Sequence, residues 1–111
     1  MNYEKLAISI GFSYLNGGNL YWEDSYGNIK SYDSMDNKYL ENCVAFVKRG
    51  IEELNSPYDT DINSDIKKKA KRMYNINLDD AKLKDAKKNI SDILANKLNE
   101  LQIYIKDRKV R

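Results

Sequence analysis

Residues 20–50 decide the fold, and they read LYWEDSYGNIKSYDSMDNKYLENCVAFVKRG. Two short segments rich in β-branched and aromatic residues flank a glycine-containing turn, a pattern typical of a hairpin. We expect strands over Leu20–Glu23 and Ile29–Tyr32, joined by a turn at residues 24–28. Asp36 then predicts the start of a helix, because its carboxylate can accept hydrogen bonds from the free amides of the first turn.

The helix that follows Asp36 is expected to cover the strands with one apolar face. Its apolar residues recur at spacings of three and four, as Leu40, Cys43, Val44, Val47, Ile51 and Leu54. Pro57 cannot continue a helix, so the predicted bounds are residues 36–55. Upstream, large apolar residues alternate with small ones over Leu6–Leu15, which predicts a further strand. Residues 1–34 are therefore expected to form an antiparallel β-meander of two or three strands.

Two further helices are predicted downstream. The first, over residues 61–74, is short and has its apolar face at Ile62, Ile66, Ala70 and Met73. The second is long, over residues 78–107 with Asn77 as its N-cap, and its apolar stripe is Leu83, Ala86, Ile90, Leu94, Leu98, Leu101 and Ile105. This stripe recurs about every 3.7 residues, which favours a helix packed on its own domain over a coiled coil. Residues 1–111 are thus predicted to form one α+β domain.

Composition restricts the class of protein. The chain is 41% hydrophobic and 32% charged, values typical of a compact soluble domain and too apolar for disorder. The longest apolar run, Leu6–Ile10, is too short to span a membrane and lacks the features of a signal peptide. The single cysteine, Cys43, cannot form an internal disulfide, so a reducing cytoplasmic location is expected.

Residues used in common catalytic sites are few. The chain has no histidine, which removes the usual general base and most zinc sites. Cys43 lies on the apolar face of the first long helix, where a small buried side chain is the simpler interpretation. Residues 59–65 resemble the start of a calcium loop, but Ser64 and Ala70 replace the required glycine and glutamate. The sequence therefore predicts no enzyme, no metal site and no cofactor.

Charge and aromatic residues are distributed unevenly, which suggests two candidate surfaces. Residues 1–61 hold 5 Lys/Arg and 10 Asp/Glu, a net charge of −5, and residues 62–111 hold 14 and 7, a net charge of +7. Attraction between the two halves within the fold is the simpler explanation of this asymmetry, and two faces with different partners are the alternative. The first candidate surface, for a partner, consists of Tyr21, Glu23, Asp24, Tyr26, Tyr32 and Asp33. Only one face of a small sheet can reach the core, so some rings are expected to be exposed, with Trp22 buried.

The second candidate surface is basic, and it consists of Lys67, Lys68, Lys71, Arg72, Lys84 and Lys88. Such a cluster is the electrostatic footprint of nucleic-acid binding. A solvated helix face is the more frequent explanation of such a run of lysines, and acidic residues interleave with them. Nucleic-acid binding through this surface is therefore kept as the alternative.

Residues 22–42 resemble a segment common in small phage and prophage proteins. In those proteins a Trp and a turn glycine precede a Met and a helix that opens with His/Tyr-Leu-x-Asn. The matching residues here are Trp22, Gly27, Ile29, Met35, Tyr39, Leu40 and Asn42. The resemblance implies an origin in a mobile element and does not imply an activity.

Small phage accessory proteins without catalytic residues act mostly by binding. Together with the acidic, aromatic first half and the lack of a catalytic set, this origin favours a counter-defence inhibitor, of the anti-CRISPR type or a sponge for a signal molecule, in the host cytoplasm if a phage encodes the chain. Its partner would be a host protein, such as a nucleic-acid-binding defence complex, or a small signalling nucleotide. The alternative is a nucleic-acid-binding accessory protein that uses the basic surface. The apolar residues Ile103, Tyr104 and Ile105 near the C-terminus are a candidate homodimer contact.

Overall fold

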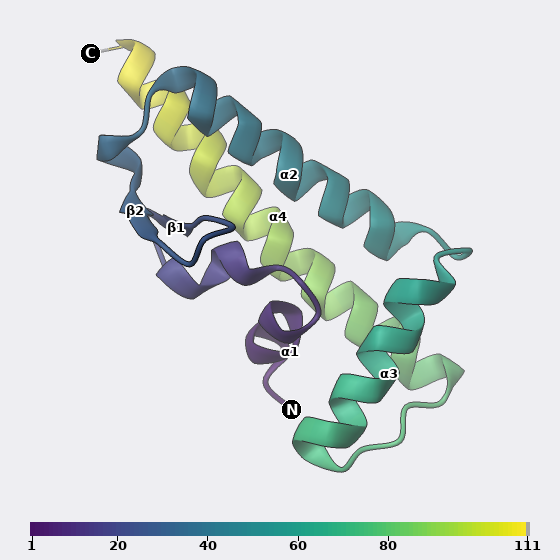
Figure 1. Cartoon of the computed structure of the whole chain (residues 1–111). Coiled ribbons are helices and arrows are strands. Elements are labelled where there is room, and N and C mark those ends of the chain that lie inside the picture. The colour runs from purple at the N-terminus through teal and green to yellow at the C-terminus, as the bar shows by residue number, and fades with distance from the viewer. Residues whose placement is uncertain (111) are drawn as a thin grey trace.

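The computed structural model describes residues 1–110. Two long antiparallel helices, α2 (Asn37–Asn55) and α4 (Asp80–Val110), run side by side along the molecule, which measures 48 × 24 × 19 Å (Figure 1). The N-terminal elements lie along one side of this pair: α1 (Tyr3–Ser9), the 3₁₀ turn η1 (Ser13–Gly17), and the strands β1 (Tyr21–Glu23) and β2 (Ile29–Ser31). A second 3₁₀ turn, η2 (Tyr32–Ser34), leads into α2, and α3 (Thr60–Tyr74) links the lower ends of the two long helices.

The expected α+β class and the hairpin are confirmed. β1 and β2 pair antiparallel, with Tyr21 opposite Ser31, Trp22 opposite Lys30 and Glu23 opposite Ile29. Trp22 is buried, as predicted, and its ring stacks on Tyr14 of η1 at 4.4 Å between centroids and an interplanar angle of 5°. This stack fixes the hairpin to the segment that precedes it.

The predicted strand over Leu6–Leu15 is wrong, because this segment forms α1 and η1. Its apolar residues satisfy helical spacing as well as alternation, and the two neighbours Leu6 and Ala7 are both fully buried. In a strand these two side chains would point to opposite faces. The side chain of Asn2 caps α1 by accepting a hydrogen bond from the Lys5 amide at 3.0 Å. The chain then reverses at Gly11, whose φ of +121° favours glycine.

The remaining helices begin at aspartates that cap them. Asp36 accepts a hydrogen bond from the Tyr39 amide at 2.7 Å, as predicted for α2. Asp59 does the same for the Ile62 amide at 3.0 Å, so α3 begins one residue earlier than expected. The cap of α4 is Asp79, which accepts from the Lys82 amide at 2.8 Å, and the prediction of Asn77 is wrong. Both residues are good caps, and local sequence did not distinguish them.

Gly50 permits a close contact between the N-terminal segment and the helix pair. It is buried within α2, and a Cβ at this position would lie 2.8 Å from Cε1 of Phe12 and 3.2 Å from Cδ1 of Leu94. Phe12 therefore reaches the junction of α2 and α4 only because residue 50 has no side chain. The glycine lowers helix propensity by about 1 kcal/mol relative to alanine, which indicates that packing determines this residue.

Gly50→Ala is therefore expected to destabilise the protein despite its better helix propensity. Overpacking a buried site costs roughly 1–3 kcal/mol, which exceeds the gain of about 1 kcal/mol in propensity. Urea unfolding measures the difference, with Asn42→Ala on the exposed face of α2 as the control. Adding Phe12→Leu to the alanine variant should recover part of the loss. A more stable Gly50→Ala protein would contradict this account.

Candidate functional site

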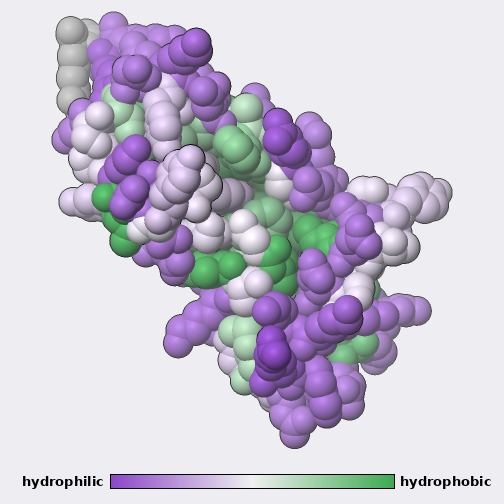
Figure 2. Space-filling model, viewed as in Figure 1, coloured by the Kyte–Doolittle hydropathy of each residue, from purple (hydrophilic) through white to green (hydrophobic). Residues whose placement is uncertain are grey.

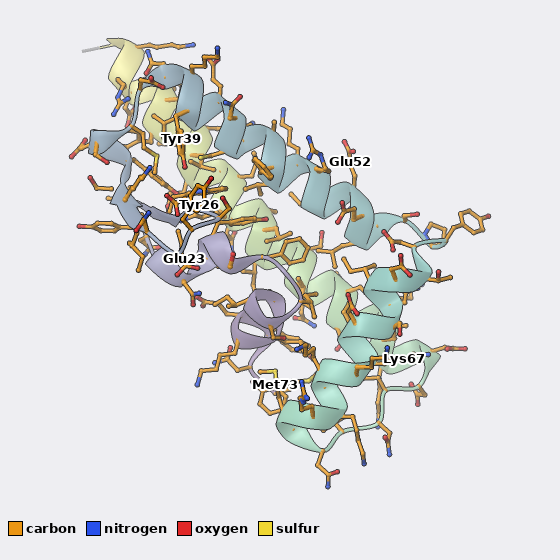
Figure 3. The ribbon with its side chains drawn as sticks, in the orientation of Figure 1. Glu23, Tyr26, Tyr39, Glu52, Lys67 and Met73 are labelled. Carbon is orange, nitrogen blue, oxygen red and sulfur yellow. The ribbon has the colours of Figure 1, made fainter. Side chains whose placement is uncertain are left out.

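The hairpin carries most of the first candidate surface. Strand alternation directs Trp22 to the core and places Tyr21, Glu23 and Ile29 on the opposite face. The exposed fractions are 51% for Leu20, 45% for Tyr21, 89% for Tyr26 and 56% for Ile29. The hairpin thus presents several large apolar side chains to solvent, with Tyr26 at the turn between the strands (Figure 3).

Asp24 organises the turn that holds Tyr26 outward. Its carboxylate accepts hydrogen bonds from the backbone amides of Tyr26 and Asn28, both at 2.9 Å, and lies 3.4 Å from the Lys30 ammonium. These contacts hold the pKa of the Asp24 carboxyl below its usual value, and the hydrogen bond from the Asn28 amide contributes most to this shift. The turn closes with Gly27 at a φ of +83°. Asp24 was predicted to bind a partner, and its visible role is to fix the turn.

The other residues predicted for this surface are less accessible to a partner. Glu23 is partly buried and accepts a hydrogen bond from the Asn16 side chain at 3.2 Å. Asp33 is exposed and accepts from the Tyr104 hydroxyl. Tyr32, which was also assigned to this surface, cannot contact a partner there, because only 1% of it is accessible. β2 ends at Ser31, and the 3₁₀ turn that begins at Tyr32 directs its ring into the core.

Beneath the hairpin lies a buried lysine that the sequence analysis missed. Lys97 of α4 is only 6% exposed, and its ammonium donates to the carbonyl oxygens of Gly18 at 2.9 Å and Tyr21 at 2.6 Å. It lies 3.4 Å from a carboxylate oxygen of Glu100 and 5.1 Å from the centre of the Tyr32 ring. Burial lowers the pKa of Lys97, and the neighbouring Glu100 opposes that shift. The sequence did contain one indication that Lys97 is buried, which is its position between Leu94 and Leu101 within the apolar stripe.

Glu100 completes the attachment of the hairpin to α4. The same carboxylate oxygen accepts from the Leu20 amide at 2.8 Å and from the Tyr32 hydroxyl at 2.7 Å. Burial is the main cause of a raised pKa of the Tyr32 hydroxyl, and the Glu100 carboxylate raises this pKa further. Leu20 has a φ of +66°, a left-handed conformation that is strained for a side chain other than glycine. The hydrogen bond to Glu100 helps to hold this residue in place at the start of β1.

The C-terminal part of α4 fixes the segment after the hairpin. Arg108 donates to the carbonyl oxygens of Met35 at 2.6 Å and Tyr32 at 2.8 Å. Its guanidinium also lies 5.0 Å from the centre of the Tyr104 ring, which packs edge-on against Tyr32. The hairpin and η2 are therefore bound to α4 by charged side chains at two levels along the helix.

The structure divides the predicted basic surface into two parts. Lys67, Lys68, Lys71 and Arg72 are exposed on α3, where Figure 3 labels Lys67. Within this group Lys71 bonds to the Asn75 side chain at 2.9 Å, and Lys67 is 4.0 Å from Asp80. Lys84 and Lys88 instead line a cleft of about 880 Å³ between the end of α2 and the start of α4. Leu54, Pro57 and Leu83 are among its apolar lining, and Asp80, Asp85 and Asp92 also line it.

Two potentially reactive features have structural explanations. Cys43 is 2% exposed, and burial raises the pKa of its thiol to about 12, so the nucleophilic thiolate is scarce at neutral pH. Asp59, at the start of the calcium-like run, caps α3. Among residues 1–110, no group of three or more acidic or cysteine side chains is arranged to hold a metal ion.

No helix in the described part of the chain combines the length and apolar character needed to cross a membrane. Comparison of the sequence and the structure with known protein families, curated proteins and solved structures finds no match. Inference about function therefore rests on the surfaces described above.

Lys97→Met should destabilise the protein by about 3 kcal/mol, because it leaves the partly buried Glu100 without its counter-charge and the Tyr21 carbonyl oxygen without its donor. Urea unfolding followed by the fluorescence of Trp22, the only tryptophan, measures this and reports on the hairpin. Adding Glu100→Gln should recover part of the loss. Lys88→Met, at an exposed position of the same helix, is the matched control and should change stability little. Equal stability of the two lysine variants would contradict a clamping role for Lys97.

Proposed function

We propose that this chain acts by binding a protein partner through the hairpin, without catalysing a reaction. The observation that supports this is the exposure of four large side chains, Leu20, Tyr21, Tyr26 and Ile29, on a single short element. Clustered exposed apolar groups on a small protein mark interaction sites. Tyrosine in particular supplies a large contact area at low entropic cost and is enriched among residues that dominate binding energy.

The rigidity of the hairpin favours this use. Asp24 fixes the turn, and Lys97 with Glu100 fixes the start of β1 to α4. A preorganised binding element loses less conformational entropy on association, so more of the contact energy appears as affinity. A loop without these contacts would present the same side chains at a greater entropic cost.

The charge around the hairpin favours a basic partner. Glu23 and Asp33 lie on this segment, and residues 1–61 carry an excess of acidic side chains. Such a surface attracts a positively charged groove and accelerates association with it. The nucleic-acid-binding groove of a host protein has this character.

The resemblance of residues 22–42 to phage proteins gives this partner a biological setting. We propose a counter-defence inhibitor of the anti-CRISPR type, acting in the host cytoplasm on a nucleic-acid-binding defence complex. A sponge for a signalling nucleotide is the variant of this proposal that would use the cleft at Lys84 and Lys88. Its volume of about 880 Å³ is in the range of small-molecule sites.

The proposal is tested by phage plating on hosts that each carry one defence system. Expression of the chain should restore plating on a sensitive host, and Tyr21→Ser/Tyr26→Ser should abolish the effect. Loss of two central aromatic residues should weaken binding to the purified defence complex by roughly 30-fold or more. Tyr58→Ser is the matched control, because Tyr58 is 87% exposed but lies between α2 and α3. Full activity of the double variant would contradict a role for the hairpin.

Nucleic-acid binding is the second candidate, supported by the four exposed cationic side chains on α3. It predicts affinity for duplex or single-stranded DNA at ~50 mM salt that falls steeply as salt rises. Lys68→Glu/Arg72→Glu should abolish this binding, whereas Lys106→Glu, at the other end of the molecule, should not. Absence of binding at low salt would remove this alternative.

A further inference from the structure

The hydrogen-bond pattern of the hairpin shows which backbone groups point out of the sheet. The bonds at its two ends run from the Tyr32 amide to the Leu20 carbonyl at 3.0 Å and from the Asp24 amide to the Asn28 carbonyl at 2.9 Å. Hydrogen-bonded pairs alternate with non-bonded pairs in an antiparallel ladder, so Trp22 and Lys30, midway between these ends, form the next bonded pair. The residues between the bonded pairs direct their amides and carbonyls away from the neighbouring strand.

The outer edge of β1 is closed at Tyr21, where η1 packs along the strand. The Tyr21 amide donates to the Gly18 carbonyl at 3.3 Å. The Tyr21 carbonyl accepts from the Lys97 ammonium at 2.6 Å. A further strand could pair with this residue only by displacing η1 and the buried lysine.

The outer edge of β2 is open. Its outward backbone groups belong to Ile29 and Ser31, and one of them, the Ser31 carbonyl, accepts from the Ser34 hydroxyl at 2.7 Å. The two amides and the Ile29 carbonyl have no hydrogen-bond partner among residues 1–110. Ile29 is 56% exposed, and Figure 1 places β2 at the margin of the molecule with β1 on its inner side. A row of free donors and acceptors on an exposed edge is complementary to the backbone of another strand.

We propose that β2 binds an extended segment of the protein partner as a third, antiparallel strand. The inference rests on the proposed function of the hairpin and adds main-chain hydrogen bonds to its side-chain contacts. In strand addition the backbone supplies affinity, and alternate side chains supply specificity. The partner residue opposite Ile29 would lie on the face that carries Tyr21, so a β-branched or aromatic side chain fits there.

Lys30 defines the next position of the partner segment. It is the only cationic residue within residues 20–37, and its side chain is 44% exposed. One carboxylate, that of Asp24, lies 3.4 Å from its ammonium, which has three donors and can serve a second acceptor. The partner residue opposite Lys30 is therefore expected to be Asp or Glu. This requirement concerns one pair and leaves Glu23 and Asp33 to attract cations elsewhere on the partner.

The same lysine disfavours a second copy of the chain on this edge. An antiparallel pairing of two β2 strands that uses the groups of both Ile29 and Ser31 centres on Lys30. Each Lys30 would then face Lys30 of the partner subunit in a non-bonded pair, where Cα atoms approach to about 4.5 Å. Like charges directly opposite each other destabilise a sheet, and edge lysines commonly prevent self-association. The edge is thus suited to a strand of different sequence.

The homodimer contact expected near the C-terminus is separate from this edge. Ile105 lines a groove of about 400 Å³ between α2 and α4. Tyr104 packs edge-on against Tyr32, and Ile103 is 51% exposed. Strand addition at β2 involves none of these three residues.

Ser31→Pro tests the proposal because it removes an outward amide and leaves the ladder intact. Ser31 has a φ of −75°, which proline adopts without strain, and the preceding Lys30 is extended, as a residue before proline prefers. Urea unfolding should show no loss of stability. Ser31→Ala is the matched control, since it removes the hydroxyl and keeps the amide.

The binding probe is a capped peptide of about nine residues in which valine and threonine alternate around a central glutamate. Added at roughly millimolar concentration to the full, isotope-labelled chain, it should shift the amide resonances of Ile29 and Ser31. Affinity should fall at least tenfold for Ser31→Pro and remain unchanged for Ser31→Ala. Absence of shifts in the wild-type chain would overturn the proposal. A wild-type chain that dimerises in sedimentation, with loss of the dimer in Ser31→Pro, would also overturn it in favour of a second copy.

Two altered peptides test the register and the role of Lys30. N-methylation of the residues on either side of the glutamate removes the amides that would face β2 and should abolish binding. N-methylation of the glutamate itself affects an amide that points away from β2 and should be tolerated. Replacing the glutamate by lysine should weaken binding several-fold at ~50 mM salt. Equal affinity of all these peptides would contradict strand addition.

The plating assay separates this inference from the proposed function. Ser31→Pro should abolish relief of the defence system, and Ser31→Ala should retain it. Loss of activity in Tyr21→Ser/Tyr26→Ser with full activity in Ser31→Pro would overturn strand addition and leave the hairpin as the binding site. Peptide binding at β2 without relief of any defence system would support the open edge and contradict the counter-defence role.

Discussion

The ion pair of Lys97 and Glu100 is the interaction on which the arrangement of the N-terminal half depends. A hairpin of two three-residue strands is not stable by itself in water. Burial of a lysine costs several kcal/mol unless its charge and its donors are all satisfied. Here the two carbonyl oxygens of the hairpin region supply those acceptors, and Glu100 supplies the counter-charge. The lysine therefore specifies where the hairpin docks, because any other position would leave it buried and unpaired.

Local rules explain which parts of the fold could be predicted from sequence. The Asp36 cap and the apolar stripes identified α2, α3 and α4, because both signals act within a few residues of the chain. The turn around Gly27 identified the hairpin for the same reason. The prediction of a strand over Leu6–Leu15 failed because the apolar residues of this segment fit a period of two as well as helical spacing. Packing against α4, far away in the sequence, decides between those periods in favour of α1.

The candidate site was predictable only where exposure follows from local geometry. Tyr26 lies at a turn, and a turn tip is exposed whatever covers the strands. Tyr32 was misjudged because its direction depends on where β2 ends and on an acceptor, Glu100, that is 68 residues away. Lys97 was overlooked because a lysine in a helix is normally assigned to solvent. Its role depends on carbonyl groups more than 70 residues distant, which no local pattern reveals.

The long helix α4 contacts its surroundings on three sides, and the type of contact on each side determines how specifically a neighbour is placed. One side packs on α2, and a second holds the hairpin and η2 through Lys97 and Arg108. A third borders a groove of about 400 Å³, which Ile105 lines. Apolar packing alone does not distinguish one neighbour from another. The directed hydrogen bonds from Lys97 and Arg108 to backbone carbonyl oxygens therefore carry the information that places the hairpin and η2 on one side of α4.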